Sequence, residues 1–78
     1  MCLAVPGVLL EVYDAGGLFA RGRVEFGGVQ REVSLVCVPE AGVGDWVLVH
    51  AGLAIAVIDA AAAAATRAAL ARLDEAAP

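Results

Sequence analysis

The chain has 78 residues, of which 62% are hydrophobic and 18% are charged, and its formal net charge is −4. A chain of this length forms one small domain around a single core. The acidic balance disfavours a surface that binds phosphate groups, so we expect no nucleic-acid partner. No apolar run reaches the ~20 residues that a membrane span requires, and no signal peptide is recognisable. We therefore expect a cytoplasmic protein without a membrane partner.

The opening segment, residues 1–7, contains a cysteine at position 2. Removal of the initiator methionine would place the thiol of Cys2 and an α-ammonium on the same residue, and that positive charge favours the reactive thiolate. On position alone, a small apolar residue at the start of a strand is the commoner role of a cysteine. Both roles stay open at this point. We expect Pro6 and Gly7 to bend the opening segment away from the body of the domain.

Five short segments have the composition and alternation that are typical of β-strands. They are Val8 to Tyr13, Leu18 to Phe26, Val29 to Val38, Trp46 to His50 and Leu53 to Ile58. Within the second segment, the isolated Gly22 indicates a bulge or a tight bend. Alternation places Phe19 on the apolar face of the second segment. It also places Cys37 on the apolar face of the third, where we interpret it as a small buried hydrophobe.

A helix is predicted for the rest of the chain. The carboxylate of Asp59 can accept the free amide hydrogens of a first helical turn, and the stretch from Ala60 to Ala76 has high helix propensity. A narrow stripe that could dock on the sheet consists of Thr66, Ala69, Leu70 and Leu73.

These elements predict a mainly β protein. We expect a small five-stranded OB-like β-barrel over residues 1–58 and a C-terminal α-helix over residues 59–78, which together form one domain. A two-layer arrangement of sheet and helix is the alternative, and the barrel is preferred because closure protects the sheet edges. Trp46 is interpreted as a plug at one end of the barrel.

Few side chains could carry chemistry. His50 is the single histidine and ends the fourth strand, where it could cap the strand or act as a metal ligand or proton carrier. Arg21, Arg23 and Arg31 form a cationic feature that is either a solvated strand surface or a contact for an acidic partner. No Cys-x-x-Cys pair and no phosphate-binding loop are present, and the short chain leaves little room for a ligand pocket.

Three segments together resemble the HypC/HupF/HybG family of hydrogenase maturation chaperones. They are residues 1–7, the strand from Gly28 to Leu35, and the stretch from Val43 to Ile55. The resemblance implies an OB-like barrel with a C-terminal helix that is not an enzyme. It implies a role in assembling the iron, cyanide and carbon monoxide part of the nickel–iron hydrogenase site. The implied partners are HypD, an iron–sulfur scaffold protein, and the precursor of the hydrogenase large subunit.

The resemblance also assigns residues. The family's essential cysteine falls on Cys2 and its signature histidine on His50, and we expect these two to bind iron transiently, with cyanide and carbon monoxide ligands, when partners are present. No cofactor is expected to be bound stably. Supporting positions of the same motifs are Pro6, Gly7, Arg31 and Gly52.

Departures from the family pattern are Leu53, where phenylalanine is common, and alanines in place of acidic residues in the helix. A generic OB-fold binding module without a hydrogenase role is the alternative function, although an acidic chain with few aromatic residues offers few platforms for nucleic acid. A cysteine-dependent enzyme is disfavoured because no base is fixed in the sequence next to Cys2.

Overall fold

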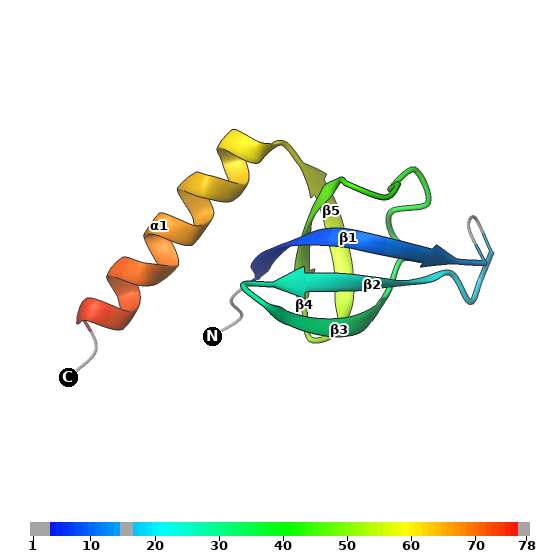
Figure 1. Ribbon diagram of the computed structural model, residues 1–78, viewed down its shortest axis with the longest axis horizontal. Helices are drawn as coiled ribbons and strands as arrows, with labels where there is room; N and C mark the ends of the chain where they lie inside the picture. Colours follow the sequence, from blue (N-terminus) through cyan, green and yellow to red (C-terminus); the bar gives the residue numbers. More distant parts are fainter. Residues whose placement is uncertain (1–3, 15–16, 77–78) are drawn as a thin grey trace.

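The computed structural model describes residues 4–14 and 17–76, with side chains described as far as residue 72. Within these residues, five strands close into a barrel in the order β1-β2-β3-β5-β4, and one helix follows (Figure 1). The elements are β1 Val5–Tyr13, β2 Arg21–Phe26, β3 Val29–Ser34, β4 Trp46–His50, β5 Leu53–Ile58 and α1 Ala60–Ala76. The predicted class is confirmed: the protein is mainly β, with a closed five-stranded barrel and a C-terminal helix.

The barrel closes through a very short contact. The pairs β1–β2, β1–β4, β2–β3 and β4–β5 are antiparallel ladders of several residues each. By contrast, β3 and β5 are parallel and, in the described part of the chain, pair only through Ser34 and Leu53. The backbone N–H of Ser34 donates to the carbonyl oxygen of Gly52 at 2.9 Å. The barrel is therefore sealed at the C-terminal end of β3 and open beside the rest of that strand.

The interior of the barrel is apolar. Among the described residues, no polar or charged side chain is buried. The largest fully buried side chains are Leu9, Leu35, Val24 and Val47. Burial of one such side chain contributes roughly 1.5–3 kcal/mol, so each of these four residues stabilises the barrel appreciably.

Pro6 and Gly7 lie inside β1, where they pair with residues of β4. A Cβ atom on Gly7 would lie only 2.3 Å from Cγ1 of Val24, so glycine allows β1 to pack closely against β2. Pro6 and Gly7 therefore continue the strand rather than end it, while the predicted bend of Cys2 away from the barrel lies outside the described residues. The first strand begins at Val5 rather than Val8, because the proline and the glycine remain paired with β4.

The irregularity predicted at Gly22 lies in the strand opposite it. The register between β1 and β2 shifts between Leu9 and Glu11, so Leu10 is an extra residue in β1. Gly22 permits the close approach of the two strands there, since a Cβ atom on it would lie 2.6 Å from Cδ1 of Leu9. The glycine and the bulge are therefore two parts of one bend.

The second strand is shorter than predicted. It begins at Arg21, and the residues before it form a turn in which the N–H of Ala20 donates to the carbonyl of Gly17 at 3.2 Å. Leu18 and Phe19 are 84% and 79% exposed. The prediction that Phe19 lies on an apolar strand face is wrong, because the turn places it outside the sheet.

The third strand also ends early, at Ser34. A tight turn follows, in which the N–H of Val38 donates to the carbonyl of Leu35 at 3.0 Å. This turn breaks the alternation, so Cys37 is exposed and Val38 is buried in its place. The prediction of a buried Cys37 is wrong.

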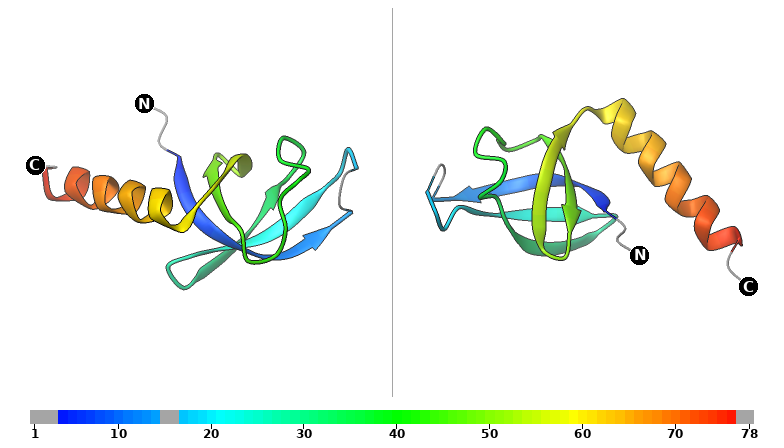
Figure 2. Two further views of the ribbon diagram at one scale, coloured as in Figure 1. Left: turned by 90° about the horizontal axis from the view of Figure 1, so that it is seen from above. Right: turned by 180° about the vertical axis from the view of Figure 1, so that it is seen from behind.

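The helix begins as predicted. Oδ1 of Asp59 accepts a hydrogen bond from the N–H of Ala62 at 2.7 Å, which confirms Asp59 as the N-cap. Only the first part of the helix lies against the barrel, where Ala63 is fully buried, and the rest projects away (Figures 1 and 2). In the predicted docking stripe Ala69 is exposed, and the side chain of Leu73 lies outside the described part. The molecule therefore extends 42 Å along its longest axis but 23 and 19 Å along the others.

Trp46 lies at the junction between β4 and the helix. The guanidinium carbon of Arg67 is 6.0 Å from the centre of its ring. The indole, predicted to plug the barrel end, is partly exposed and lies beneath this arginine. The helix formed by the described residues is not long and apolar enough to cross a membrane.

Candidate functional site

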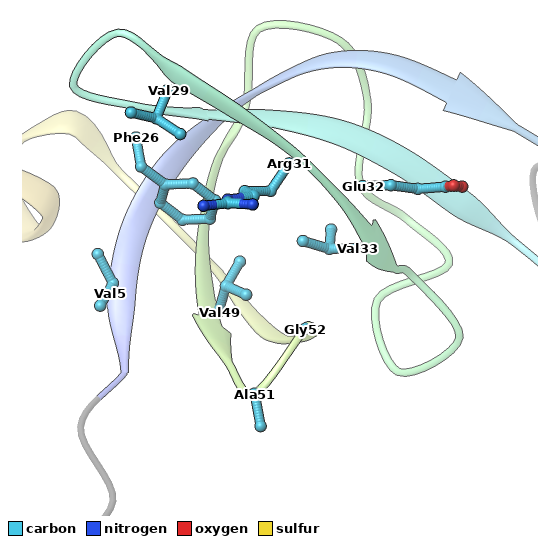
Figure 3. A pocket seen from close by; sticks show the side chains of 9 residues that line it. All are labelled: Val5, Phe26, Val29, Arg31, Glu32, Val33, Val49, Ala51 and Gly52. Atoms are coloured by element: carbon cyan, nitrogen blue, oxygen red, sulfur yellow. The ribbon is translucent and has the colours of Figure 1, made fainter.

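An open hollow of about 520 Å³ lies where β1, β2, β3 and the β4–β5 turn meet (Figure 3). Its apolar lining consists of Val5, Phe26, Val29, Val33, Val49 and Ala51. The prediction that so short a chain leaves little room for a pocket is wrong. The hollow exists because β5 begins at Leu53, which pairs with Ser34 at the end of β3, so in the described part of the chain no strand pairs with the rest of β3 on that side.

Arg31 is the cationic residue of this hollow. Alternation along β3 places it on the same face as the buried Val33, and its side chain points across the opening while Glu32 points the other way (Figure 3). Glu32 instead forms an ion pair with Arg21, with an N–O distance of 3.2 Å. Among the described residues, no carboxylate lies within ion-pair distance of Arg31. The three arginines therefore do not form one cationic patch.

The turn between β4 and β5 forms one rim of the hollow. Its two central residues, Ala51 and Gly52, have φ angles of 52° and 80°, the combination that a tight two-residue hairpin requires. Gly52 adopts this conformation without strain, whereas a residue with a Cβ atom pays about 1–2 kcal/mol in the left-handed region. Since the carbonyl of Gly52 also accepts the hydrogen bond from Ser34, the turn holds the barrel closed.

His50 immediately precedes this turn. Alternation along β4 places its imidazole on the face opposite to Val47 and Val49, which are buried. The imidazole is partly exposed and is not part of the lining of the hollow. Within the described residues, no group of three or more His, Cys, Asp or Glu side chains could hold a metal ion.

Cys2 lies outside the described residues, but the register of β1 shows where its segment is attached. Val5 pairs with Val49 in an antiparallel ladder, so the chain before Val5 emerges beside His50. Three residues of extended chain span at most about 11 Å, which limits the distance between the Cα atoms of Cys2 and Val5. The structure thus brings Arg31 and Gly52 together at the hollow. The iron site at Cys2 and His50 stays a prediction.

Sequence reasoning missed the role of Asp45. Its carboxylate accepts a hydrogen bond from the N–H of Gly42 at 2.8 Å. Its carbonyl accepts one from the N–H of Leu9 at 2.9 Å, and the N–H of Gly44 donates to the carbonyl of Leu9 at 2.8 Å. These bonds fasten the loop before β4 to β1. The signal was present in the Gly-x-Gly-Asp pattern, because aspartate side chains often accept backbone hydrogen bonds in turns.

Tyr13, the last residue of β1, has a raised pKa. Its hydroxyl donates a hydrogen bond to Oε2 of Glu11 at 2.8 Å. This bond stabilises the protonated phenol and raises the pKa of Tyr13 above its ordinary value. Neither residue lines the hollow.

Comparison with known proteins supports the resemblance noted from the three segments. The model of the HupF/HypC family matches residues 1–70. The hydrogenase maturation factor HypC of Synechocystis sp. is 45% identical over 67 residues, which cover 85% of this chain and 88% of that protein. HypC of Rhodobacter capsulatus is 42% identical over 80 residues, covering 97% and 81%. The hydrogenase maturation factor HybG of Escherichia coli K12 is 37% identical over 78 residues, covering 95% and 93%. The family match and the names of these relatives, which are maturation factors, bear out the expectation of an accessory protein that is not an enzyme.

Proposed function

Because the chain belongs to the HupF/HypC family, we propose that it acts as a chaperone in hydrogenase maturation. The observation that carries this proposal is the family match over residues 1–70, which includes both the segment with Cys2 and the turn with His50. In this role the chain binds a HypD-type scaffold protein and then the precursor of the hydrogenase large subunit. It helps to deliver an iron that carries cyanide and carbon monoxide.

We assign the docking and iron-binding role to Cys2. A thiolate is the form of cysteine that binds metals, and sulfur suits an iron that also carries soft ligands such as cyanide and carbon monoxide. One thiolate from this chain leaves the other ligand positions to its partners, so the isolated chain binds the iron weakly and can release it. Among the described residues Cys37 is a free, exposed cysteine, which is in keeping with work in the cytoplasm.

His50 is proposed as the second group of this site. Its partly exposed imidazole stands next to the point where the chain leading to Cys2 leaves the barrel. From there it can accept the thiol proton or serve as a further ligand once a partner is bound. The variant His50→Ala should therefore impair iron delivery and leave the thermal unfolding of the barrel unchanged. A large fall in the unfolding temperature would instead show that the imidazole is structural.

The experiment that tests the proposal is co-purification through a C-terminal tag, which leaves Cys2 unmodified. Wild-type chain and the variant Cys2→Ala are each mixed with the purified scaffold protein and with the large-subunit precursor. Cys37→Ala is the matched control, because it removes the exposed thiol in the turn after β3. We expect Cys2→Ala to unfold at the wild-type temperature and to form neither complex, while Cys37→Ala forms both. Normal complexes with Cys2→Ala would contradict the mechanism.

A further inference from the structure

The strand β3 has an unpaired edge beside the hollow. On one side it pairs with β2 along its whole length, from Val29 opposite Phe26 to Ser34 opposite Arg21. On the other side, as far as the described residues go, it pairs with β5 at Ser34 alone. Residues 29–33 therefore have a neighbouring strand on one side only. We call this part of β3 the free edge.

The backbone groups that point toward the free edge can be identified from the ladder. The N–H of Ser34 points toward β5, since it donates to the carbonyl of Gly52. In an antiparallel ladder, the N–H and C=O groups of every second residue point to the same side. Those of Gln30 and Glu32 therefore point to the free edge as well. They are the groups that an extended peptide pairs with when it adds a strand to a sheet.

The hollow lies directly below these groups and offers positions for the side chains of such a peptide. Its lining is mostly apolar, with Val5, Phe26 and Val29 among its residues, and its two charged members are Arg31 and Glu32. Val29 is 51% exposed and Val5 is 40% exposed, so both present apolar surface that a partner could cover. Arg31 adds one positive charge, and no described carboxylate lies within ion-pair distance of it, since Glu32 pairs with Arg21 instead.

We propose that an extended segment of a partner protein adds a strand to the free edge of β3, with apolar side chains in the hollow and an Asp or Glu side chain against Arg31. The carboxylate belongs to a side chain rather than to a chain terminus, because Arg31 lies in the middle of β3 with Val29 and Val33 on either side of it on the same face. Since alternate residues of a strand face one side, the expected pattern is apolar, any, acidic, any, apolar.

A second copy of this chain is a poor occupant of the same edge. Two β3 strands that paired antiparallel about the middle of the free edge would place Arg31 opposite Arg31, and like charges directly opposite are destabilising. The net charge of −4 on each copy also opposes self-association. An acidic and apolar segment of another protein avoids the first obstacle, because it places a carboxylate rather than a second guanidinium opposite Arg31.

This inference deepens the proposed function and rests on it for the identity of the partner. Val5 forms part of the wall of the hollow and is three residues from Cys2. A segment bound along β3 would hold the partner close to the thiol. The strand addition would thus supply affinity, while Cys2 would supply the contact with iron.

The test uses the full chain and random nine-residue peptides displayed on phage, so neither iron nor a hydrogenase protein is needed. The affinities of the selected peptides are then measured by calorimetry against four variants. Gln30→Pro removes the N–H that points to the free edge, and Gln30→Ala is its matched control. Arg31→Gln removes the charge in the hollow, and Arg23→Gln removes a charge from the outer face of β2.

We expect the selected peptides to show the alternating apolar and acidic pattern. Arg31→Gln should weaken their binding about tenfold or more, as loss of a hydrogen bond to a charged group does. Gln30→Pro should weaken it at least as much, whereas Gln30→Ala and Arg23→Gln should bind like the wild type. The proposal is overturned if no peptide is selected, or if the peptides bind Gln30→Pro as tightly as Gln30→Ala.

Three further variants keep the test decisive. If Gln30→Pro does not fold, the comparison of Arg31→Glu with Arg23→Glu replaces it, and equal affinities of these two would overturn the proposal. Cys2→Ala should bind the selected peptides with wild-type affinity. Failure of peptide binding therefore leaves the role of Cys2 standing, and failure of the Cys2 experiment leaves the strand addition standing.

Discussion

Replacement of Gly7 by alanine should destabilise the barrel, although the residue lies in the same opening motif as Cys2. The added Cβ atom would lie 2.3 Å from Cγ1 of Val24, 2.8 Å from Cε1 of Phe26 and 2.9 Å from the carbonyl oxygen of Glu25. Ordinary contacts between carbon atoms are about 3.5–4.0 Å, so the methyl group cannot fit without movement. Val24 is fully buried and the carbonyl of Glu25 belongs to the backbone, so neither can swing aside.

The magnitude follows from two opposing effects. Overpacking of a well-packed interior costs about 1–3 kcal/mol. Alanine also restricts the unfolded chain more than glycine does, which offsets about 0.4–1 kcal/mol of that cost. We therefore expect a net loss of roughly 1–2 kcal/mol in the free energy of unfolding. For a domain of this size the unfolding temperature should fall by about 5–15 °C.

The assay is urea unfolding followed by the fluorescence of Trp46, the single tryptophan. The midpoint should fall, while the slope m stays constant because the same surface is exposed on unfolding. Gly42→Ala is the matched control, since the nearest atom to its added Cβ would be Oδ2 of Asp45 at 3.8 Å, an ordinary contact. Its stability should equal that of the wild type or exceed it. If Gly7→Ala were as stable as Gly42→Ala, the inference that β1 packs too closely on β2 to admit a methyl group at position 7 would be refuted.

Three further predictions concern single hydrogen bonds or backbone angles. Asp59→Ala removes the hydrogen bond from the N–H of Ala62 and should lower the stability of α1 by about 1 kcal/mol. Far-ultraviolet circular dichroism should show less helix in Asp59→Ala than in Asp59→Ser, whose hydroxyl can still cap the helix. Equal spectra would refute the role of Asp59 as the cap. Ala51→Gly should raise the free energy of unfolding by about 0.5–1 kcal/mol, because glycine tolerates the φ of 52°; a lower urea midpoint would contradict this. Glu11→Gln should lower the pKa of Tyr13 toward 10.0, because the mutation removes the carboxylate that stabilises the protonated phenol. Phenolate absorbance reports this single tyrosine, and an unchanged titration would rule out the bond to Glu11.

Local patterns were sufficient to predict most of the barrel. The strands β4 and β5 and the helix have the predicted bounds, because alternation, paired glycines and the Asp59 cap are signals between near neighbours in the sequence. The errors fall where a turn is built from apolar residues. The turns before Arg21 and after Ser34 contain Leu18, Phe19 and Leu35, and such residues resemble strand more than turn.

The hollow and the free edge could not have been predicted in the same way. Both depend on how many residues of β3 pair with β5, and the single pair Ser34 and Leu53 joins positions far apart in the sequence. No local pattern fixes the length of such a parallel contact. The roles of Cys2 and His50 came from the family resemblance instead, since neither composition nor spacing distinguishes them from structural residues.

The most direct test of the proposed function is the iron content of the chain with and without its scaffold partner. Iron per protein should be low on the isolated wild-type chain and clearly higher on the purified complex with the HypD-type protein. When Cys2→Ala is mixed with the same partner, the iron recovered with the chain should stay at the low value of the isolated protein. Equal iron on the isolated wild-type chain and on its complex would contradict the account, as would wild-type iron with Cys2→Ala.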